Sequence, residues 1–333
     1  MKAVTMADVA REANVSKSTV SQFINKRYEF MSVETKERVE LAIKQLNYKP
    51  NYVARSLKQK KTSTIGVVVA NILHTFSTQV IRVIEDICNT SDLHVIVCNA
   101  DDRPEKERNY IEMLRAKQVD GLIIFPTGGN VDLYEKMEEQ SYPLVFVDRM
   151  VQGTGISTIL LDNAKASEML VDHLVASKYK RIAFLTSSLD RQITPRVERL
   201  EGYMNGLKKY SLPLIEGHYA GVKKEDIHGT LEQMFDNSSP PDSIICGNDL
   251  ILLEALKFIK AKGLKIPDDV ALVGIDEVPY AEIFEPPLTI VSQPAFDIGK
   301  HAANLLLEKM NGDGGGDNEI VRYAPELIVR KST

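Results

Sequence analysis

The chain has 333 residues, of which 44% are hydrophobic and 26% charged, a composition typical of globular proteins rather than of disordered or fibrous ones. No apolar run approaches the ~20 residues that span a bilayer, and the N-terminal residues lack the apolar stretch of a secretion signal. The three cysteines, Cys88, Cys98 and Cys246, form no CxxC pair, which argues against a disulfide framework, a metal site or a redox couple. We therefore expect a cytoplasmic protein of more than one domain, without metal or membrane contact.

Charge is distributed unevenly along the chain. Residues 1–61 hold 13 Lys and Arg against 6 Asp and Glu, a net charge of +7, whereas the remaining residues hold 28 against 40, a net charge of −12. A basic head on an acidic body indicates that the head alone binds a polyanion. The alternative is a solvated basic tail, but the head also carries a helical pattern.

Two short helices are predicted at the start of the head. Thr5 suits the N-cap of the first, and Asn14 tolerates the left-handed conformation that ends it. Ser16 suits the N-cap of a second helix over residues 17–24, in which apolar and small polar residues recur at helical spacing. Two such helices fit a helix-turn-helix, whose second helix enters the major groove of DNA. The alternative is a generic helical hairpin.

A third helix and a weaker fourth segment complete the head. Ser32 suits the N-cap of the third helix, and Asn47 suits its end. Residues 50–61 follow, where Pro50 fits a first helical turn but too few apolar residues occur for a stable isolated helix. We expect this segment to fold only when it meets a partner.

Three stretches of the head resemble the lac/gal repressor family of bacterial transcription regulators: residues 8–11 (DVAR), 15–21 (VSKSTVS) and 48–57 (YKPNYVARSL). The resemblance implies that the second helix reads the major groove, and that paired hinge helices of a dimer enter the minor groove. There Leu57 would act as a wedge in the central base step, rather than as an ordinary apolar helix contact. The residues that the resemblance places on DNA are Thr5, Lys17, Ser18, Thr19, Ser21, Gln22, Asn25, Tyr48, Asn51, Ala54, Arg55 and Leu57.

The head departs from the family pattern at one reading position. The family usually has an arginine after the Thr-Val-Ser triplet, whereas this chain has Gln22, and the loop over residues 26–31 is longer than usual. Arginine favours guanine and glutamine favours adenine, because their donor and acceptor groups match those base edges. We therefore expect a half-site that differs from the usual one at that base.

The body predicts two similar α/β halves with parallel sheets. Continuous apolar runs suit strands buried on both faces, and the helical stretches between them suit crossovers. The expected strands are residues 65–69, 94–98, 121–125, 144–147, 181–185, 243–246 and 270–273, and the expected helices are residues 76–89, 105–117, 164–177, 199–210 and 249–262. Ligands of such sheets bind beyond the carboxyl ends of the strands, and polar residues occupy every loop there.

The body also resembles the repressor family, whose core is similar to periplasmic sugar-binding proteins. The matching stretches include residues 147–149 (VDR), 199–203 (RLEGY), 247–249 (GND) and 286–289 (PPLT). The resemblance implies a head over residues 1–49, a hinge helix over 50–61 and a core over 62–333. The core divides into one subdomain of about residues 62–162 and 292–322 and another of about 163–291 and 323–333.

The same resemblance implies an effector site between the subdomains. Its candidate residues are His74, Phe76, Asp148, Arg191, Arg196, Arg199, Asn248 and Asp276. Arginine suits a carboxylate, a phosphate or vicinal hydroxyls, and two arginines facing the cleft would indicate an anionic effector. Helix capping by Asp148 and Asp249, a loop-surface position for His74 and a solvated helix start for the arginines are the alternatives.

Catalysis has no visible machinery in the sequence. The glycine-rich residues 312–317 follow a helix rather than a strand, so neither a dinucleotide fingerprint nor a Walker loop is supported. Neither G-x-S-x-G nor HExxH occurs, and the six histidines lack metal-binding spacing. We therefore expect no enzyme activity and no cofactor.

The expected function is repression of a carbohydrate catabolism operon by a homodimer bound to palindromic operator DNA. A sugar or sugar-acid effector between the subdomains would release it. Residues 17–28 resemble repressors of pectin and hexuronate breakdown, which implies a 2-keto-3-deoxygluconate-like acid as effector. The alternative is a sugar-binding receptor or a sugar-converting enzyme without DNA regulation.

Overall fold

The computed structural model describes residues 4–29, 31–49, 61–312 and 319–333. Contacts divide the chain into two units, Met1–Thr62 and Ser63–Thr333, called here the head and the core. Residues 50–60 of the expected hinge helix lie outside the described residues. Among the described residues, no helix has the length and apolar character needed to cross a bilayer, and no cluster of His, Cys, Asp or Glu is placed to hold a metal ion.

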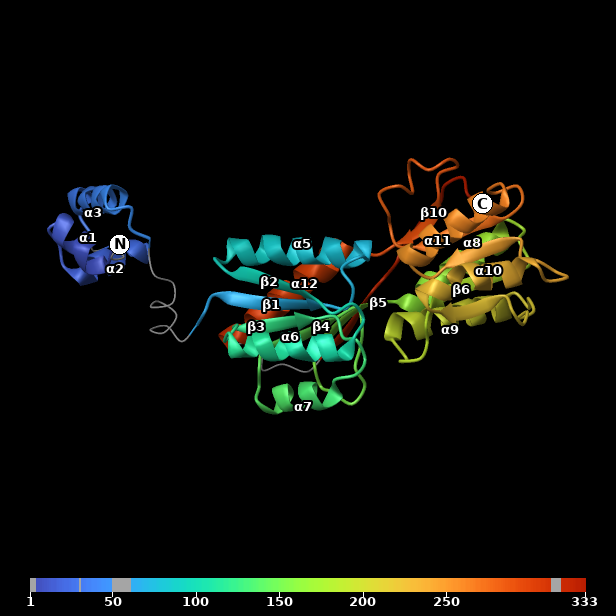
Figure 1. Cartoon of the computed structure of the whole chain (residues 1–333), viewed down its shortest axis with the longest axis horizontal. Helices are drawn as coiled ribbons and strands as arrows, with labels where there is room; N and C mark the ends of the chain where they lie inside the picture. The colour runs from blue at the N-terminus through green and yellow to red at the C-terminus, as the bar shows by residue number, and fades with distance from the viewer. Residues whose placement is uncertain (1–3, 30, 50–60, 313–318) are drawn as a thin grey trace. The chain divides into compact units, whose positions relative to one another are not determined.

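The head contains the three predicted helices, α1 (Met6–Glu12), α2 (Lys17–Ile24) and α3 (Val33–Gln45) (Figure 1). Their predicted caps are confirmed. The hydroxyl of Ser16 accepts a hydrogen bond from the Thr19 N–H at 3.1 Å, and the hydroxyl of Ser32 accepts one from the Thr35 N–H at 3.2 Å. At the start of α1, the Asp8 carboxylate accepts a hydrogen bond from the main-chain N–H of Thr5 at 2.9 Å. One small core joins the helices, built from Val9, Ala10, Ala13, Val20, Val39, Ala42 and Tyr48.

The first sheet of the core is entirely parallel, with strand order β11-β5-β4-β3-β1-β2. Helices α5 and α12 cover one face through an apolar cluster, and α6 and α7 cover the other (Figure 1). We call this part the N-lobe. Its elements are β1 (Thr64–Val69), α5 (Thr75–Thr90), β2 (His94–Asn99), α6 (Pro104–Ala116), β3 (Gly121–Ile124), α7 (Val131–Glu139), β4 (Leu144–Val147), β5 (Thr158–Leu161), α12 (Ala295–Asn311) and β11 (Ile320–Tyr323).

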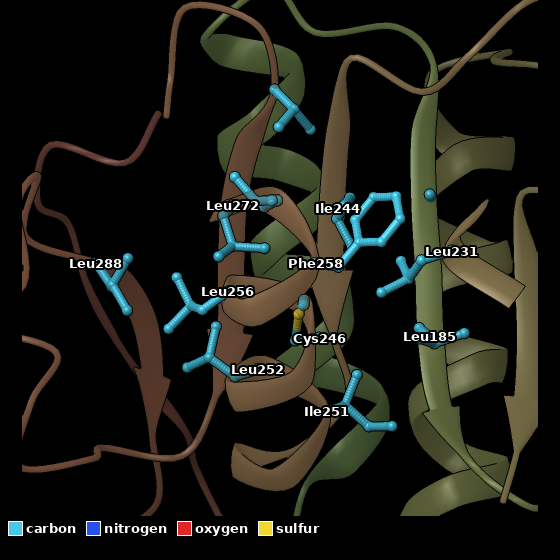
Figure 2. Close-up of a cluster of buried hydrophobic side chains, with 14 of the residues drawn as sticks. Leu185, Leu231, Ile244, Cys246, Ile251, Leu252, Leu256, Phe258, Leu272 and Leu288 are labelled. Atoms are coloured by element: carbon cyan, nitrogen blue, oxygen red, sulfur yellow. The ribbon is translucent and has the colours of Figure 1, made fainter. Parts of the chain in front are cut away.

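The second sheet has strand order β12-β10-β9-β8-β6-β7. We call this sheet and the helices that cover it the C-lobe. Helices α8 and α9 cover one face, and α10 and α11 cover the other, where Leu185, Leu252, Phe258 and Leu272 meet in one buried cluster (Figure 2). Its elements are α8 (Asn163–Ala176), β6 (Ile182–Ser187), α9 (Thr194–Lys209), β7 (Tyr219–Val222), η1 (Lys224–Asp226), α10 (Ile227–Phe235), β8 (Ser243–Cys246), α11 (Asp249–Lys262), β9 (Ala271–Ile275), β10 (Thr289–Ser292) and β12 (Glu326–Ile328).

The chain passes between the sheets three times, after β5, after β10 and after β11. The last crossing explains why β12 is antiparallel to β10, although the sequence predicted parallel sheets. β11 leaves the first sheet at the carboxyl end of its strands. The carboxyl ends of the strands of both sheets face the boundary between the two lobes. A strand that enters the second sheet from that edge must run against its neighbours.

Helix α9 begins earlier than predicted. The sequence indicated a loop up to Arg199, but the helix starts at Thr194 with Pro195 in its first turn, where the missing N–H costs nothing. The predicted start of this helix, at residue 199, was therefore wrong by five residues. The earlier start places Arg196 and Arg199 on one face of the same helix, one turn apart.

Candidate functional site

The exposed surface of α2 presents few side chains that are free of local hydrogen bonds. Lys17, Ser18 and Gln22 are exposed. Ser18 shares a hydrogen bond of 2.6 Å with the hydroxyl of Ser16, and the amide of Asn25 donates to the main-chain oxygen of Ser21 at 2.7 Å. Lys17 and Gln22 are thus the long polar side chains that this helix offers to a neighbouring molecule.

The remaining predicted DNA residues divide into three groups. Thr5 is exposed at the start of α1, and Thr19 and Ser21 are half-buried in α2. Tyr48 is only 8% exposed and packs in the core of the head, so its ring is turned inward. Outside the described residues lie Asn51, Ala54, Arg55 and Leu57.

The candidate effector site is a narrow cleft between the two lobes, with a cavity of about 40 Å³. Its walls come from segments that follow β1, β3, β4, β8, β9 and β10, from the end of β6, and from the first two turns of α9. Of the eight predicted effector residues, seven line it: His74, Phe76, Asp148, Arg196, Arg199, Asn248 and Asp276. Arg191 does not. It lines a neighbouring cavity of about 440 Å³ and donates to the main-chain oxygen of Asp102.

Arg199 and Asp276 form the C-lobe side of the cleft. The Arg199 guanidinium is 5% exposed and donates to Asn163 Oδ1 at 2.8 Å and to the Gly247 oxygen at 2.6 Å. Burial raises the pKa of Asp276 to about 6; the Arg199 charge opposes this rise and the Asp249 charge adds to it. Asp276 is therefore a carboxylate whose charge is only partly compensated by the protein.

Two aspartates at the ends of strands have left-handed backbone conformations, Asp148 with φ 68° and Asp276 with φ 98°. Residues other than glycine adopt such angles at a cost of about 1–3 kcal/mol, and they concentrate at functional sites. Both side chains line the cleft. The backbone strain thus coincides with the place where two carboxylates are turned toward a shared space.

Asp249 joins the two lobes instead of capping its own helix. Asn248 is the N-cap of α11 and accepts from Ile251 N–H at 2.9 Å. The Asp249 carboxylate lies 2.6 Å from His74 Nδ1 and accepts from Thr75 N–H at 2.7 Å, at the positive end of α5. Burial of the imidazole opposes protonation, but the hydrogen bond and charge of Asp249 outweigh it and raise the pKa of His74.

Three polar residues are among the cleft residues that sequence reasoning missed: Arg149, Thr186 and Gln293. Each side chain is at least nine-tenths buried and lines the cleft. Within the described part of the chain, Thr186 Oγ1 and Gln293 Oε1 have no hydrogen-bond partner, and Arg149 Nε has only the Asp148 carboxylate beside it, at 3.4 Å. Buried polar groups are normally paired, so Thr186 Oγ1 and Gln293 Oε1 mark positions where a polar ligand would make hydrogen bonds.

A signal for these residues existed in the sequence. All three lie at or just past the carboxyl end of a strand, where ligands of parallel sheets bind. Thr186 was hidden because β6 extends two residues beyond its predicted end, and Gln293 because β10 was not predicted. Arg149 was visible beside Asp148, but nothing in the sequence indicated that its guanidinium would be buried at the cleft.

Comparison with known proteins identifies the class. Residues 5–51 match the model of bacterial regulatory proteins of the lacI family, and residues 171–333 match the periplasmic binding protein-like domain. The chain is 46% identical to the "Probable HTH-type transcriptional regulator EndR" of Paenibacillus polymyxa, over 98% of both chains. It is 34% identical to the HTH-type transcriptional regulator KdgR of Bacillus subtilis (strain 168), over 98% of this chain and 97% of that one.

The fold agrees with these relatives. The structure of the lac repressor dimer bound to operator and the anti-inducer ONPF has a TM-score of 0.86 at 27% identity, over 99% of both chains. The chain belongs to the lacI family of bacterial transcription regulators. It is a DNA-binding regulator of the repressor type and not an enzyme.

Proposed function

We propose that this regulator represses a carbohydrate catabolism operon as a homodimer on a palindromic operator, and that a sugar or sugar acid in the cleft releases it. The observation that carries the effector site is the pair of buried polar atoms, Thr186 Oγ1 and Gln293 Oε1, that line the cleft without a hydrogen-bond partner among the described residues. A structurally similar regulator, CelR, is known in complex with cellobiose (TM-score 0.74, 25% identity). The similarity to KdgR supports a keto-deoxy sugar acid as a candidate.

Effector binding in this cleft is coupled to the angle between the lobes. A cavity of about 40 Å³ holds a few waters but not a monosaccharide, so a ligand must part the walls. Direct contacts hold the lobes together, including Thr194 Oγ1 to both the N–H and the oxygen of Met150 (3.0 and 3.2 Å) and Arg322 to Glu198 (2.6 and 2.8 Å). A ligand that binds better at one lobe angle shifts the population of chains toward that conformation. A coupling free energy of ~1–3 kcal/mol between the effector site and the operator site changes operator affinity about 5–150-fold.

Removal of the head tests the DNA-binding part of the proposal. A variant lacking residues 1–61 retains the core, which makes its contacts as a separate unit. We expect it to lose operator retention, whereas the intact chain binds and releases steeply as salt rises, because each neutralised phosphate adds to the salt dependence. Electrophoretic mobility shift across a salt series measures both. Operator binding by the truncated chain at the affinity of the intact chain would rule out a DNA-reading head.

Replacement of Gln22 by arginine tests whether this side chain of α2 faces a base of the operator. Gln22 is exposed on α2, and a bidentate side chain at such a position discriminates one base pair by about 1–3 kcal/mol. We expect Gln22→Arg to change preference from adenine toward guanine at one symmetric pair of operator positions. Selection of binding sites from a random pool measures this, with Arg27→Gln as a control outside α2. An unchanged preference would show that Gln22 does not face a base.

A further inference from the structure

A single carboxylate, Asp102, is shared by arginines from both lobes. Asp102 follows β2 in the N-lobe. Its Oδ1 lies 2.7 Å from Arg149 Nη1 and 3.5 Å from Arg196 Nη2, and its main-chain oxygen accepts from Arg191. Arg149 has a second carboxylate, Asp148, at 3.4 Å. Two guanidinium groups of the cleft, those of Arg149 and Arg196, thus share the carboxylates of Asp102 and Asp148, while Arg191 binds the main chain of Asp102 from the neighbouring cavity.

Arg196 is less well compensated by carboxylates than Arg149, the other guanidinium of the cleft. Its side chain is 16% exposed, and its shortest hydrogen bond goes to the uncharged main-chain oxygen of Ser188, at 2.9 Å. Its carboxylate partner, Asp102, is already paired more closely with Arg149. Burial, and then repulsion by Arg149, lowers the pKa of Arg196 to about 10. The group stays charged at neutral pH, and a further anion beside it would be stabilised.

At the other end of the cleft, the carboxylates equal or outnumber the cations. Arg199 and His74 face Asp249 and Asp276, and His74 and Asp249 already pair with one another at 2.6 Å. Asp276 accepts from Gln293 Nε2 at 2.5 Å and from Asp249 N–H at 3.2 Å. This end is neutral or negative, and carboxylate, amide and guanidinium groups together suit the hydroxyl groups of a polyol.

We propose that the cleft is specific for an anionic effector, and that Arg196 sets this specificity by binding the acid group while Arg199 and Asp276 bind hydroxyl groups. The inference rests on the proposed function and adds the charge and the orientation of the ligand. A carboxylate and a phosphate share the required chemistry. Because Arg196 and Asp102 belong to different lobes, an acid group that takes the place of Asp102 at Arg196 removes a contact between the lobes.

Matched ligand pairs test the charge requirement. Thermal shift and calorimetric titration of the full chain would compare glucose with glucuronate and with glucose 6-phosphate, and would include inorganic phosphate alone. We expect the acids or phosphate to raise the melting temperature, and glucose to have no effect at the same concentration. The carboxylate and phosphate arms distinguish the two sources of the acid group.

Two variants with opposite expected effects on anion affinity test the role of Arg196. Arg196→Gln should weaken anion binding tenfold or more, whereas Asp102→Asn should strengthen it, because the competing carboxylate is gone. A general loss of structure cannot strengthen binding, so Asp102→Asn keeps the test valid if Arg196→Gln folds poorly. Arg103→Gln, an exposed arginine next to Asp102 in sequence, serves as the matched control and should bind anions as the unmodified chain does.

Three results would overturn the inference: equal protection by glucose and its acids, unchanged anion affinity in both variants, or no protection by any acid or by phosphate. Operator binding is measured in parallel to separate this outcome from failure of the proposed function. If a neutral sugar releases the operator, the proposed function stands and the anion requirement falls. If the chain binds no operator, the proposed function itself fails.

Discussion

Replacement of Gly202 by alanine should lower the stability of the core strongly. A Cβ atom at this position of α9 would lie 2.1 Å from the main-chain oxygen of Ala164 and 2.7 Å from its carbonyl carbon. Neither atom can move without shifting α8, because both belong to its backbone. We expect a loss of about 3 kcal/mol, the upper part of the range for overpacking, and a melting temperature lower by about 6–12 °C.

A second glycine gives the matched control. Gly229 lies in α10, and a Cβ there would meet no atom within 4 Å. Gly229→Ala should therefore stabilise the chain by about 0.5–1 kcal/mol, since alanine has the better helix propensity. Calorimetric melting of both variants measures the contrast. A Gly202→Ala chain that melts within a degree of the unmodified chain would mean that α8 and α9 are not packed as closely as described.

The head was largely predictable because its signals are local. Caps such as Ser16 and Ser32 act within three residues of their own position, and helical spacing is visible in any short window. Tyr48 shows the limit. Its motif placed it on DNA, yet its ring is buried, and burial depends on packing against α1 and α3 rather than on the neighbours of Tyr48 in sequence.

The cleft was predictable only where the fold itself fixes a position. Strand ends meet at one edge, so Asp148, Asn248 and Asp276 could be assigned from order along the chain. The residues that contact these side chains across the cleft could not be assigned in this way. Asp249 is 175 residues from His74, and Asp102 is 94 residues from Arg196, so their pairing depends on how the lobes close. Arg191 lies five residues before Arg196 yet lines a different cavity, a distinction that sequence spacing does not contain.

Replacement of Arg199 by alanine should abolish the effector response and leave operator binding intact. Its guanidinium satisfies Asn163 and the Gly247 oxygen and offsets the charge of Asp276. Loss of charged hydrogen bonds of about 1.5–3 kcal/mol predicts an effector affinity lower by roughly 10–150-fold. Titration of operator release measures the response. Arg103→Ala is the control for removal of an exposed arginine, and a normal response in Arg199→Ala would contradict the assignment of Arg199 to the site.

The pH dependence of this variant follows from Asp276. The pKa of Asp276 in the folded chain, about 6, exceeds its ordinary value of 3.8. Between pH 3.8 and about 6, the folded chain therefore binds more protons than the unfolded chain. The contribution of Asp276 to the free energy of unfolding thus falls as pH rises through this range. Without Arg199 the folded pKa rises further and the loss continues to higher pH. Arg199→Ala should thus be closer in stability to the unmodified chain at pH 5 than at pH 8. Melting curves at the two pH values measure the difference, and a constant difference would mean that the Arg199 charge does not act on Asp276.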